Sequence, residues 1–195
     1  MQIPDYITDV HTHTPGRPDA ILSLPPRLAL AGCTTPYSVQ LHPWYLSDGQ
    51  SSAPLSSLAP DAPVTIAEFV SAADRLQSDP LFLAIGECGL DNRCSTPVAL
   101  QLEAFRVALS VAHRLRLPVI IHCVGLWSQM QQCCRQAGVL SDPATPVIVH
   151  GYRKGPDLAR QLLRAGFSLS LGARFHPDVP DLIPPGRLWH ESDTD

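Results

Sequence analysis

The sequence predicts a TIM barrel, an α/β fold of eight parallel strands with outer helices, in one domain spanning residues 1–195. Short apolar runs bounded by Pro and Gly alternate with amphipathic segments, which is typical of buried parallel strands joined by helical crossovers. Polar residues follow several of these runs, at the strand ends where (β/α) barrels carry their active sites. The predicted strands are Tyr6–His13, Ala20–Leu24, Tyr37–His42, Leu81–Glu87, Pro118–His122, Pro146–His150, Phe167–Leu171 and Leu188–Asp193.

Three segments between these strands have apolar residues at helical spacing. Val64–Gln77 begins with Thr65 and Glu68, which have the spacing of a capping box. Pro97–Arg116 repeats the apolar pattern, and Pro156–Ala165 has a proline in its first turn and a glycine just past its end. These segments would supply helical crossovers of the barrel.

The connections are short, so we expect a compact barrel. Ser47–Pro63 is rich in Ser, Pro and Ala and predicts a loop near His42. The chain stops two residues after Asp193, so it lacks the outer helix that normally covers the seam between the last strand and the first. A bare seam would expose apolar surface, and we therefore expect either a homo-oligomer that covers it or a C-terminally truncated form of a longer protein.

Composition excludes disordered and fibrous proteins, because 45% of the residues are hydrophobic and 16% are charged. No apolar run approaches the roughly 18 residues of a membrane-spanning helix, and the N-terminus lacks the layout of a signal peptide. We expect a cytoplasmic protein with no membrane partner and reduced cysteines. Cys88 and Cys123 follow proposed ligands directly, and strand alternation favours packing in the core for both.

The net charge is −4, and the 14 basic residues are scattered along the chain. A broad surface for duplex nucleic acid would need a basic stripe, so the sequence argues against one. Phosphate substrates remain compatible with this charge, because bound divalent metals would supply local positive charge.

Residues of metal-ligand type recur at the ends of the predicted strands. His11 and His13 lie two apart, so both rings would point to one face and into the barrel mouth. An isolated His-x-His pair is weak evidence, but three further candidates follow equivalent strands, and histidine with carboxylate suits Zn, Mn, Fe or Mg. The six candidate ligands are His11, His13, Glu87, His122, His150 and Asp193.

Glycines flank the carboxylate of Glu87 in the segment Gly86–Asp91. A tight turn with a capping acid would account for this pattern. The functional interpretation, which we favour, is that Glu87 bridges two metals and that the glycines permit close approach of backbone and substrate. Asp91 would orient or cap within this site.

Taken in order over nearly the whole chain, these motifs resemble the signature series of the TatD family of metal-dependent hydrolases. Gly-Glu-x-Gly-Leu-Asp is the most distinctive of them. The matching segments are His11-x-His13, His42-Pro43-Trp44-Tyr45, Gly86-Glu87-x-Gly89-Leu90-Asp91, Pro118-Val-Ile-Ile-His122, His150-Gly151 and Glu191-Ser192-Asp193.

The resemblance implies an amidohydrolase-like TIM barrel with deoxyribonuclease activity and two divalent metal ions, which would be Mg, Mn or Zn. It implies that one metal is held by His11, His13 and Asp193. The second would be held by His122 and His150, with Glu87 bridging. Asp193 would also contact the attacking water and act as its base, so the implied catalytic residues are Asp193 and Glu87.

The chain departs from the family pattern in three places. His150-Gly-Tyr-Arg-Lys stands where the family has His-Cys-Phe-Ser-Gly. Thr194 and Asp195 end the chain where the family continues with a small residue, Pro and an aromatic. The connections are also shorter than in the larger nucleases. The ending bears on the completeness of the chain, and the other two differences bear on substrate more than on metal binding.

Three residues are candidates for substrate binding. His42 could contact a phosphate in the pocket or support the ligands from behind, and the sequence leaves both open. Arg153 and Lys154 precede a helix that starts near Pro156, and a helix N-terminus with adjacent cations suits an anion. The alternative for this pair is two solvated loop charges.

The sequence thus predicts hydrolysis of phosphodiester bonds in single-stranded or frayed DNA. Related barrels also host small ester and amide substrates, so such a substrate remains an alternative. A non-catalytic scaffold that keeps its metal site is a further alternative, from a different functional class.

Overall fold

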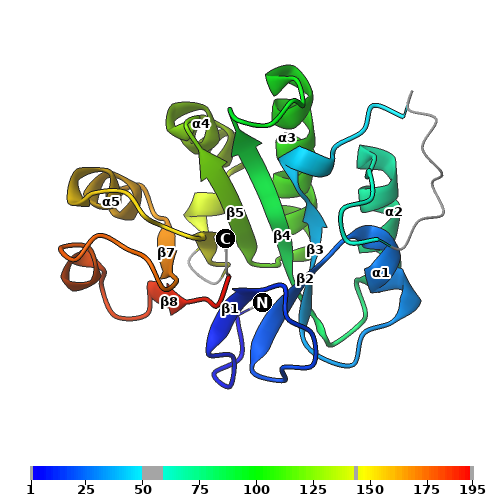
Figure 1. Ribbon diagram of the computed structural model, residues 1–195, viewed down its shortest axis with the longest axis horizontal. Helices are drawn as coiled ribbons and strands as arrows, with labels where there is room; N and C mark the ends of the chain where they lie inside the picture. Colours follow the sequence, from blue (N-terminus) through cyan, green and yellow to red (C-terminus); the bar gives the residue numbers. More distant parts are fainter. Residues whose placement is uncertain (1, 50–58, 143–144, 194–195) are drawn as a thin grey trace.

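The computed structural model describes residues 2–49, 59–142 and 145–193. Eight parallel strands form one sheet in the order β1 to β8, which curves into a nearly closed barrel (Figure 1). This arrangement confirms the predicted TIM barrel. The strands are β1 Asp9–Thr12, β2 Ala20–Leu24, β3 Tyr37–Leu41, β4 Phe82–Asp91, β5 Val119–Val124, β6 Val147–Val149, β7 Ser168–Leu171 and β8 Leu188–His190.

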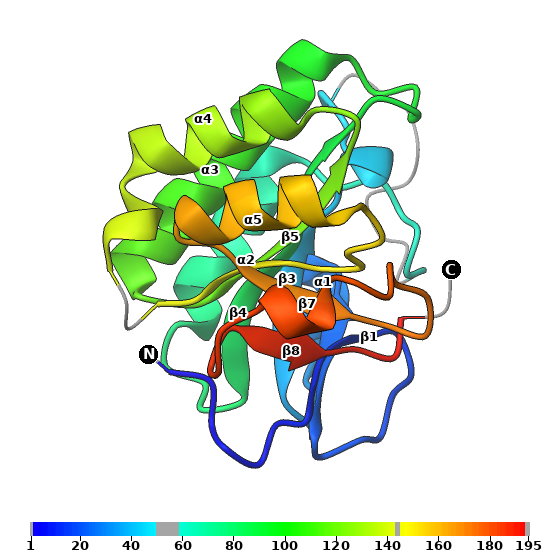
Figure 2. The ribbon, with the colours of Figure 1, turned by 90° about the vertical axis from the view of Figure 1, so that its left-hand side faces the viewer.

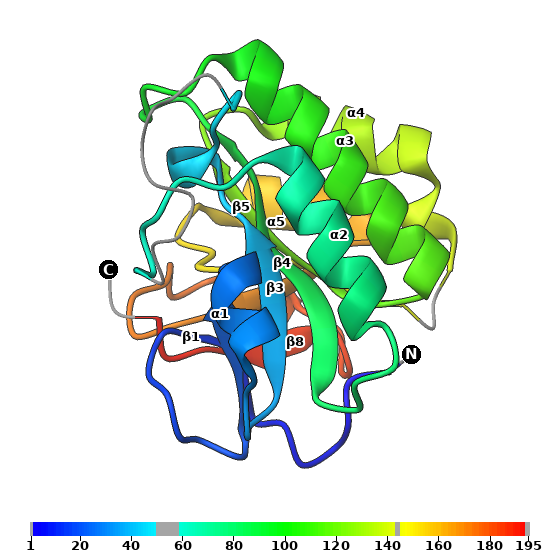
Figure 3. The same ribbon diagram turned by 90° about the vertical axis from the view of Figure 1, so that its right-hand side faces the viewer.

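The helices pack along the outer face of the sheet (Figures 2 and 3). They include the three predicted segments, and residues 13–19 join β1 to β2 without a helix. No helix among the described residues is long and apolar enough to cross a membrane. The α-helices are α1 Pro26–Ala31, α2 Ile66–Leu76, α3 Val98–Leu115, α4 Trp127–Ala137 and α5 Pro156–Arg164, and the 3-10 turns are η1 Pro43–Tyr45, η2 Val139–Ser141 and η3 Pro180–Leu182.

The predicted capping box starts α2. The Thr65 hydroxyl accepts a hydrogen bond from the Glu68 amide at 3.2 Å, and the Thr65 amide donates to the Glu68 carboxylate at 2.9 Å. Arg27 of α1 pairs with the other oxygen of Glu68 at 2.5 Å, so this carboxylate also ties α1 to α2.

The strands are apolar on both faces because each face packs against a different layer. Val119 and Ile121 of β5 belong to the outer core, which is the layer of buried side chains between the sheet and the helices. Ile120 lies between them in sequence and points into the barrel. This alternation explains why the strand sequences are continuous apolar runs. The inner core is formed by Ile3, Ile7, Val10, Ile21, Leu83, Ala84, Ile120 and Ile148, with Trp189 packed against it.

Side chains close the seam between β1 and β8, which lie side by side (Figures 1 and 2). Asp9 is buried and accepts hydrogen bonds from the Ser192 amide at 3.2 Å and the Ser192 hydroxyl at 2.6 Å. Arg17 donates to the same carboxylate at 2.5 Å. The Ser192 hydroxyl also lies 3.0 Å from that of Thr12. Asp9 therefore fixes the segment after β8 against β1, a contact that the sequence analysis missed.

Some expectations fall on residues that the structure does not describe. Residues 50–58 of the predicted loop and the final residues 194–195 belong to this group. The expectation that a homo-oligomer covers the seam, or that the chain is a truncated form of a longer protein, therefore stays a prediction.

Asp9→Asn should lower the free energy of unfolding by about 1–3 kcal/mol, because it replaces a buried acceptor oxygen with an amide that faces donors. Asp19→Asn is the matched control, since Asp19 also pairs with Arg17, at 2.9 Å, but is partly exposed, and its change should have little effect. Urea denaturation measures both. Equal shifts in the two variants would mean that the buried seam contacts add nothing to stability.

Candidate metal centre

The carboxylate of Glu87 lies at the centre of a cluster of histidines inside the barrel mouth. Glu87 is 4% exposed, and its two oxygens face histidines on different sides. Oε2 lies 3.3 Å from His11 Nε2 and 3.8 Å from His13 Nε2. Oε1 lies near the other three rings, at 3.2 Å from His42 Nε2, 2.9 Å from His122 Nδ1 and 2.7 Å from His150 Nε2.

A β-bulge turns Glu87 toward this cluster. From Ile85 to Cys88, β4 advances three residues, while β5 advances two, from Val119 to Ile121. Ile85 and Cys88 both pack in the outer core, so the extra residue lies between them. Bulges of this kind re-aim side chains next to active sites. Glu87 therefore lies within a strand that runs to Asp91, and the prediction that the strand ends at Glu87 was wrong.

The glycines of this strand make room for the neighbouring strand. A Cβ atom on Gly86 would lie 2.5 Å from the Ile120 carbonyl oxygen, and one on Gly89 would overlap that of His122. Both glycines also have positive φ angles, of 140° and 149°. The sequence predicted that these glycines allow another group to approach closely. In the structure, the group that approaches them is the backbone of β5.

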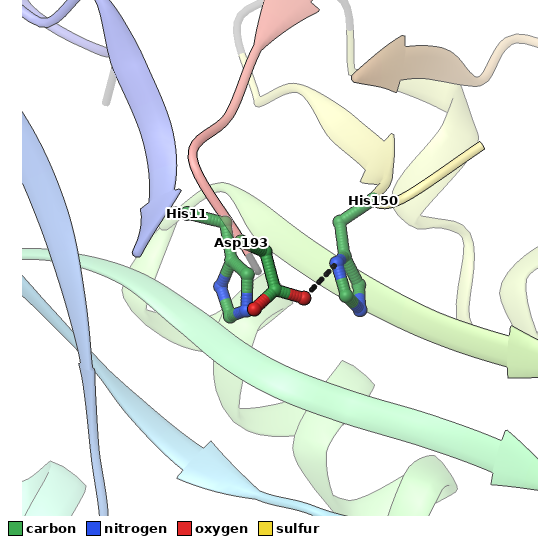
Figure 4. A group of neighbouring side chains, drawn as sticks. All are labelled: His11, His150 and Asp193. Atoms are coloured by element: carbon green, nitrogen blue, oxygen red, sulfur yellow. Dashed lines mark ion pairs between the residues drawn. The ribbon is translucent and has the colours of Figure 1, made fainter. Parts of the chain in front are cut away.

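Unpaired nitrogens in the cluster fit a metal ion. Both ring nitrogens of His11 and Nδ1 of His150 are buried and make no hydrogen bond with any described residue. Buried polar atoms without partners are costly, and a cation would satisfy these lone pairs. In Figure 4, the side chain of Asp193 lies between these two rings, with Oδ2 4.0 Å from His150 Nδ1.

Among the described residues, three groups of ligand atoms lie close enough together to share an ion. In each group the atoms are within 4.8 Å of one another. All six predicted ligands occur in these groups, together with His42. The groups are His11, His150 and Asp193; His11, His13 and Glu87; and His42, Glu87 and His122.

Asp91 orients one of the candidate ligands. Its Oδ2 atom lies 2.9 Å from His122 Nε2, while the opposite nitrogen of that ring faces Glu87. A proton on Nε2 leaves the Nδ1 lone pair directed into the cluster, as in carboxylate–histidine–metal arrangements. Asp91 also caps the backbone, because Oδ1 accepts from the Arg93 amide at 2.7 Å. It thus performs both roles that the sequence left open.

His42 is better placed to donate a hydrogen bond than to coordinate a metal. Its Nδ1 atom accepts from the Trp44 amide at 3.2 Å. A neutral imidazole carries one proton, so the proton must then be on Nε2, which faces Glu87. The sequence allowed His42 either to contact substrate or to support the ligands, and this tautomer is compatible with donation to either.

Neighbouring histidines stabilise the ionised form of Glu87. Burial alone would raise the pKa of this carboxyl group, but His150, His42 and His11 outweigh it and hold the pKa well below its usual value. Burial likewise opposes the charged form of His150, but Glu87 and Glu191 raise its pKa well above the usual range. The histidines of the cluster therefore surround an ionised Glu87.

Glu191 supports the His150 side of the cluster and was not assigned a role from sequence. Its carboxylate accepts hydrogen bonds from the Gly151 amide at 2.8 Å and from the Ser170 hydroxyl, and lies 3.7 Å from His150 Nδ1. Burial opposes ionisation, yet these neighbours lower the pKa of Glu191 to about 2. Its place in the motif Glu191-Ser192-Asp193, which carries part of the family resemblance, was a signal in the sequence.

The cysteines are separate from this cluster. All six are free thiols. Cys88 and Cys123 pack in the outer core, as predicted, and burial raises the pKa of Cys123 to about 12.

Two adjoining cavities open above the cluster. We call the first the mouth cavity; it contains Glu87, Asp91 and Asp193 together with His13, Gln40, His42, Trp44 and Tyr45. The second, the cation cavity, contains Lys154, Trp127, Cys123, His150 and Gly151. Both are lined by Arg93, His122, Val124 and Arg153. The predicted substrate-binding residues His42, Arg153 and Lys154 thus all border the site.

Comparison with known proteins agrees with this geometry. The sequence matches the family model for TatD related DNases over residues 32–194. The chain belongs to the TatD-related DNase family.

Similar TatD-family proteins include enzymes named 3'-5' ssDNA/RNA exonuclease TatD. That of Cronobacter turicensis is 36% identical over 178 residues, covering 84% of this chain and 58% of the relative. That of Pantoea vagans is 32% identical over 141 residues, covering 65% and 51%. The chain thus spans about half the length of such curated relatives. The crystal structure of YjjV, a TatD homologue from Escherichia coli, has the same fold, with a TM-score of 0.69 and 20% identity over 96% of this chain and 79% of that one.

Asp91→Asn should weaken metal binding about 10- to 100-fold, because the amide can no longer hold the proton of His122 Nε2 as a carboxylate does. Isothermal titration with Mn²⁺ measures the affinity. Asp74→Asn, a change to an exposed carboxylate that pairs with Arg114, should leave the affinity unchanged. An unaltered affinity in Asp91→Asn would show that His122 needs no such support.

Proposed function

We propose that this protein hydrolyses phosphodiester bonds in DNA with the help of two divalent metal ions. The observation that supports this proposal most strongly is the buried carboxylate of Glu87, whose two oxygens face separate sets of histidines. Membership of the TatD-related DNase family supports the interpretation of this cluster as the site of a metal-dependent hydrolase. The names of the relatives favour a nucleic acid as the substrate.

The division of the histidines supports a bridging role for Glu87. His11 and His13 face Oε2, whereas His122 and His150 face Oε1. We therefore assign one metal to the first pair and the second metal to the other pair. Asp193 completes the first set, since its Oδ1 atom lies 4.0 Å from His13 Nε2. The metals would be Mg, Mn or Zn, which suit histidine and carboxylate ligands.

The residues around the cluster divide the chemical work among them. Bound divalent cations would neutralise charge on the phosphate and make water in the site more acidic. Asp193 would accept the proton of the attacking water. His42 would donate from Nε2 to a phosphate oxygen, and the exposed side chains of Arg153 and Lys154 would hold the phosphate from the other side.

We also propose that the protein is cytoplasmic. Six free thiols suit the reducing cytoplasm. We also propose that a homo-oligomer covers the partly exposed strand β8 at the seam.

Glu87→Gln should reduce the metal content from about two ions per chain, because a neutral amide is a poor bridge between two cations. Elemental analysis after reconstitution and gel filtration measures the content. Glu103→Gln, on the exposed face of α3, provides the control. If Glu87→Gln keeps both ions at unchanged affinity, the bridging assignment is wrong.

Asp193→Asn tests the proposed activity. The variant should lose about 10²–10⁴-fold in kcat on single-stranded DNA with Mn²⁺, because the amide cannot accept a proton. KM should change less than kcat, since the lost interaction belongs to the transition state. Asp178→Asn, at an exposed carboxylate after β7, should behave like the unmodified protein. Absence of DNA hydrolysis by the metal-loaded protein, with turnover of small esters or of nothing, would contradict the proposal.

A further inference from the structure

Trp44 is a large exposed aromatic residue at the mouth of the site. Its side chain lines the mouth cavity together with Glu87 and Asp193, and the residue is 53% exposed. Two contacts hold it in place. The indole N–H donates to Asp91 Oδ2 at 2.8 Å, and the backbone amide donates to His42 at 3.2 Å. An apolar ring is thus held in a fixed position while much of its surface remains open to solvent.

The carboxylates border only one of the two cavities. The mouth cavity contains the carboxylates of Glu87, Asp91 and Asp193. None of the described residues that line the cation cavity is acidic, and three of them carry permanent positive charge: Arg93, Arg153 and Lys154. Arg93 and Arg153 line the mouth cavity as well. An anionic group of the substrate therefore fits the cation cavity, beside the cluster that would hold the metals.

Asp91 links these two features. One of its oxygens holds the Trp44 indole, and the other accepts from the Arg93 amide at 2.7 Å. The same carboxylate also contacts His122 at 2.9 Å. A single buried side chain therefore fixes an aromatic surface, a candidate metal ligand and the backbone that carries the Arg93 side chain.

We propose that Trp44 stacks against an unpaired base of the substrate, while Arg93 contacts a phosphate farther along the same strand. Aromatic side chains that bind single strands take one base face each, with a basic groove following the backbone. A base inside a duplex is already stacked on both faces and cannot occupy this position. The arrangement therefore selects a single-stranded or frayed DNA end, and this inference rests on the proposed phosphodiester substrate.

Binding can be tested independently of hydrolysis. Fluorescence anisotropy with a labelled single-stranded 10-mer of DNA, in EDTA and at low salt, reports the Kd without turnover. Trp44→Ala should raise the Kd roughly tenfold, the size typical of one lost stacking contact, whereas Trp44→Phe should stay within about threefold. Phe175→Ala is the control, because Phe175 is similarly exposed, at 47%, but does not line either cavity.

The comparison of Trp44→Phe with Trp44→Ala separates stacking from support of Asp91. Phenylalanine keeps an aromatic ring but removes the N–H donor. Equal losses in the two variants would mean that Trp44 acts through Asp91, and no loss in Trp44→Ala would likewise overturn the stacking role. A strand made of abasic residues should bind the unmodified protein and Trp44→Ala equally well, since it offers no base.

Arg93→Ala tests the phosphate contact. It should weaken binding of both the normal and the abasic strand, and should reduce the salt dependence of log Kd by about one phosphate contact. Arg164→Ala, on the last turn of α5, removes the same charge away from both cavities. Unchanged salt dependence in Arg93→Ala would overturn this part of the inference.

A parallel cleavage assay with Mn²⁺ keeps the two proposals apart. If the strand binds with the expected dependence on Trp44 but is not cleaved, the proposed hydrolysis fails and the stacking site stands. If it is cleaved while Trp44→Ala binds and reacts normally, the stacking site fails and the proposed function stands. Failure of the unmodified protein to bind single-stranded DNA at all would overturn the stacking site.

Discussion

The site depends on the burial of one carboxylate. An isolated anion in the interior is strongly destabilised, so Glu87 requires compensating charge from every side. Five histidines lie between 2.7 and 3.8 Å from its oxygens. They come from β1 and the residue after it, from the end of β3, from β5 and from the end of β6. The barrel brings these segments together at one end of the sheet, so the candidate metal centre depends on the fold.

The strands and the gathering of the candidate ligands at the barrel mouth could be predicted from sequence because both depend on local pattern. Apolar runs mark strands that are buried on both faces, and polar residues at their ends mark the open face of the barrel. The course of β4 could not be predicted in this way. Strict alternation from Ile85, which packs outward, would also direct Glu87 outward. The bulge that turns it inward appears only in the register with β3 and β5.

The supporting carboxylates were harder to predict than the ligands they support. Asp9 accepts a hydrogen bond from Ser192, and Glu191 accepts hydrogen bonds from Gly151 and Ser170. These partners are distant in sequence. Nothing in the residues around Asp9 distinguishes it from a surface acid. Its role follows from the meeting of the first and last strands, which a periodic pattern does not encode. For Asp91, the sequence suggested a supporting role but could not identify which ring it orients.

The basic lining of the cation cavity would allow a protein with a net charge of −4 to bind the proposed anionic substrate. The carboxylates at the mouth already have partners. Glu87 and Asp193 contact the histidine cluster, and Asp91 contacts Trp44 and His122. Arg93 and Arg153 line both cavities, and Lys154 lines the cation cavity, whose described lining contains no acid. Screening limits the reach of surface charge to about 10 Å at ordinary ionic strength, so this local arrangement outweighs the overall charge of the molecule. The recognition of a single strand would therefore depend on a few residues at the mouth and would need no basic surface elsewhere.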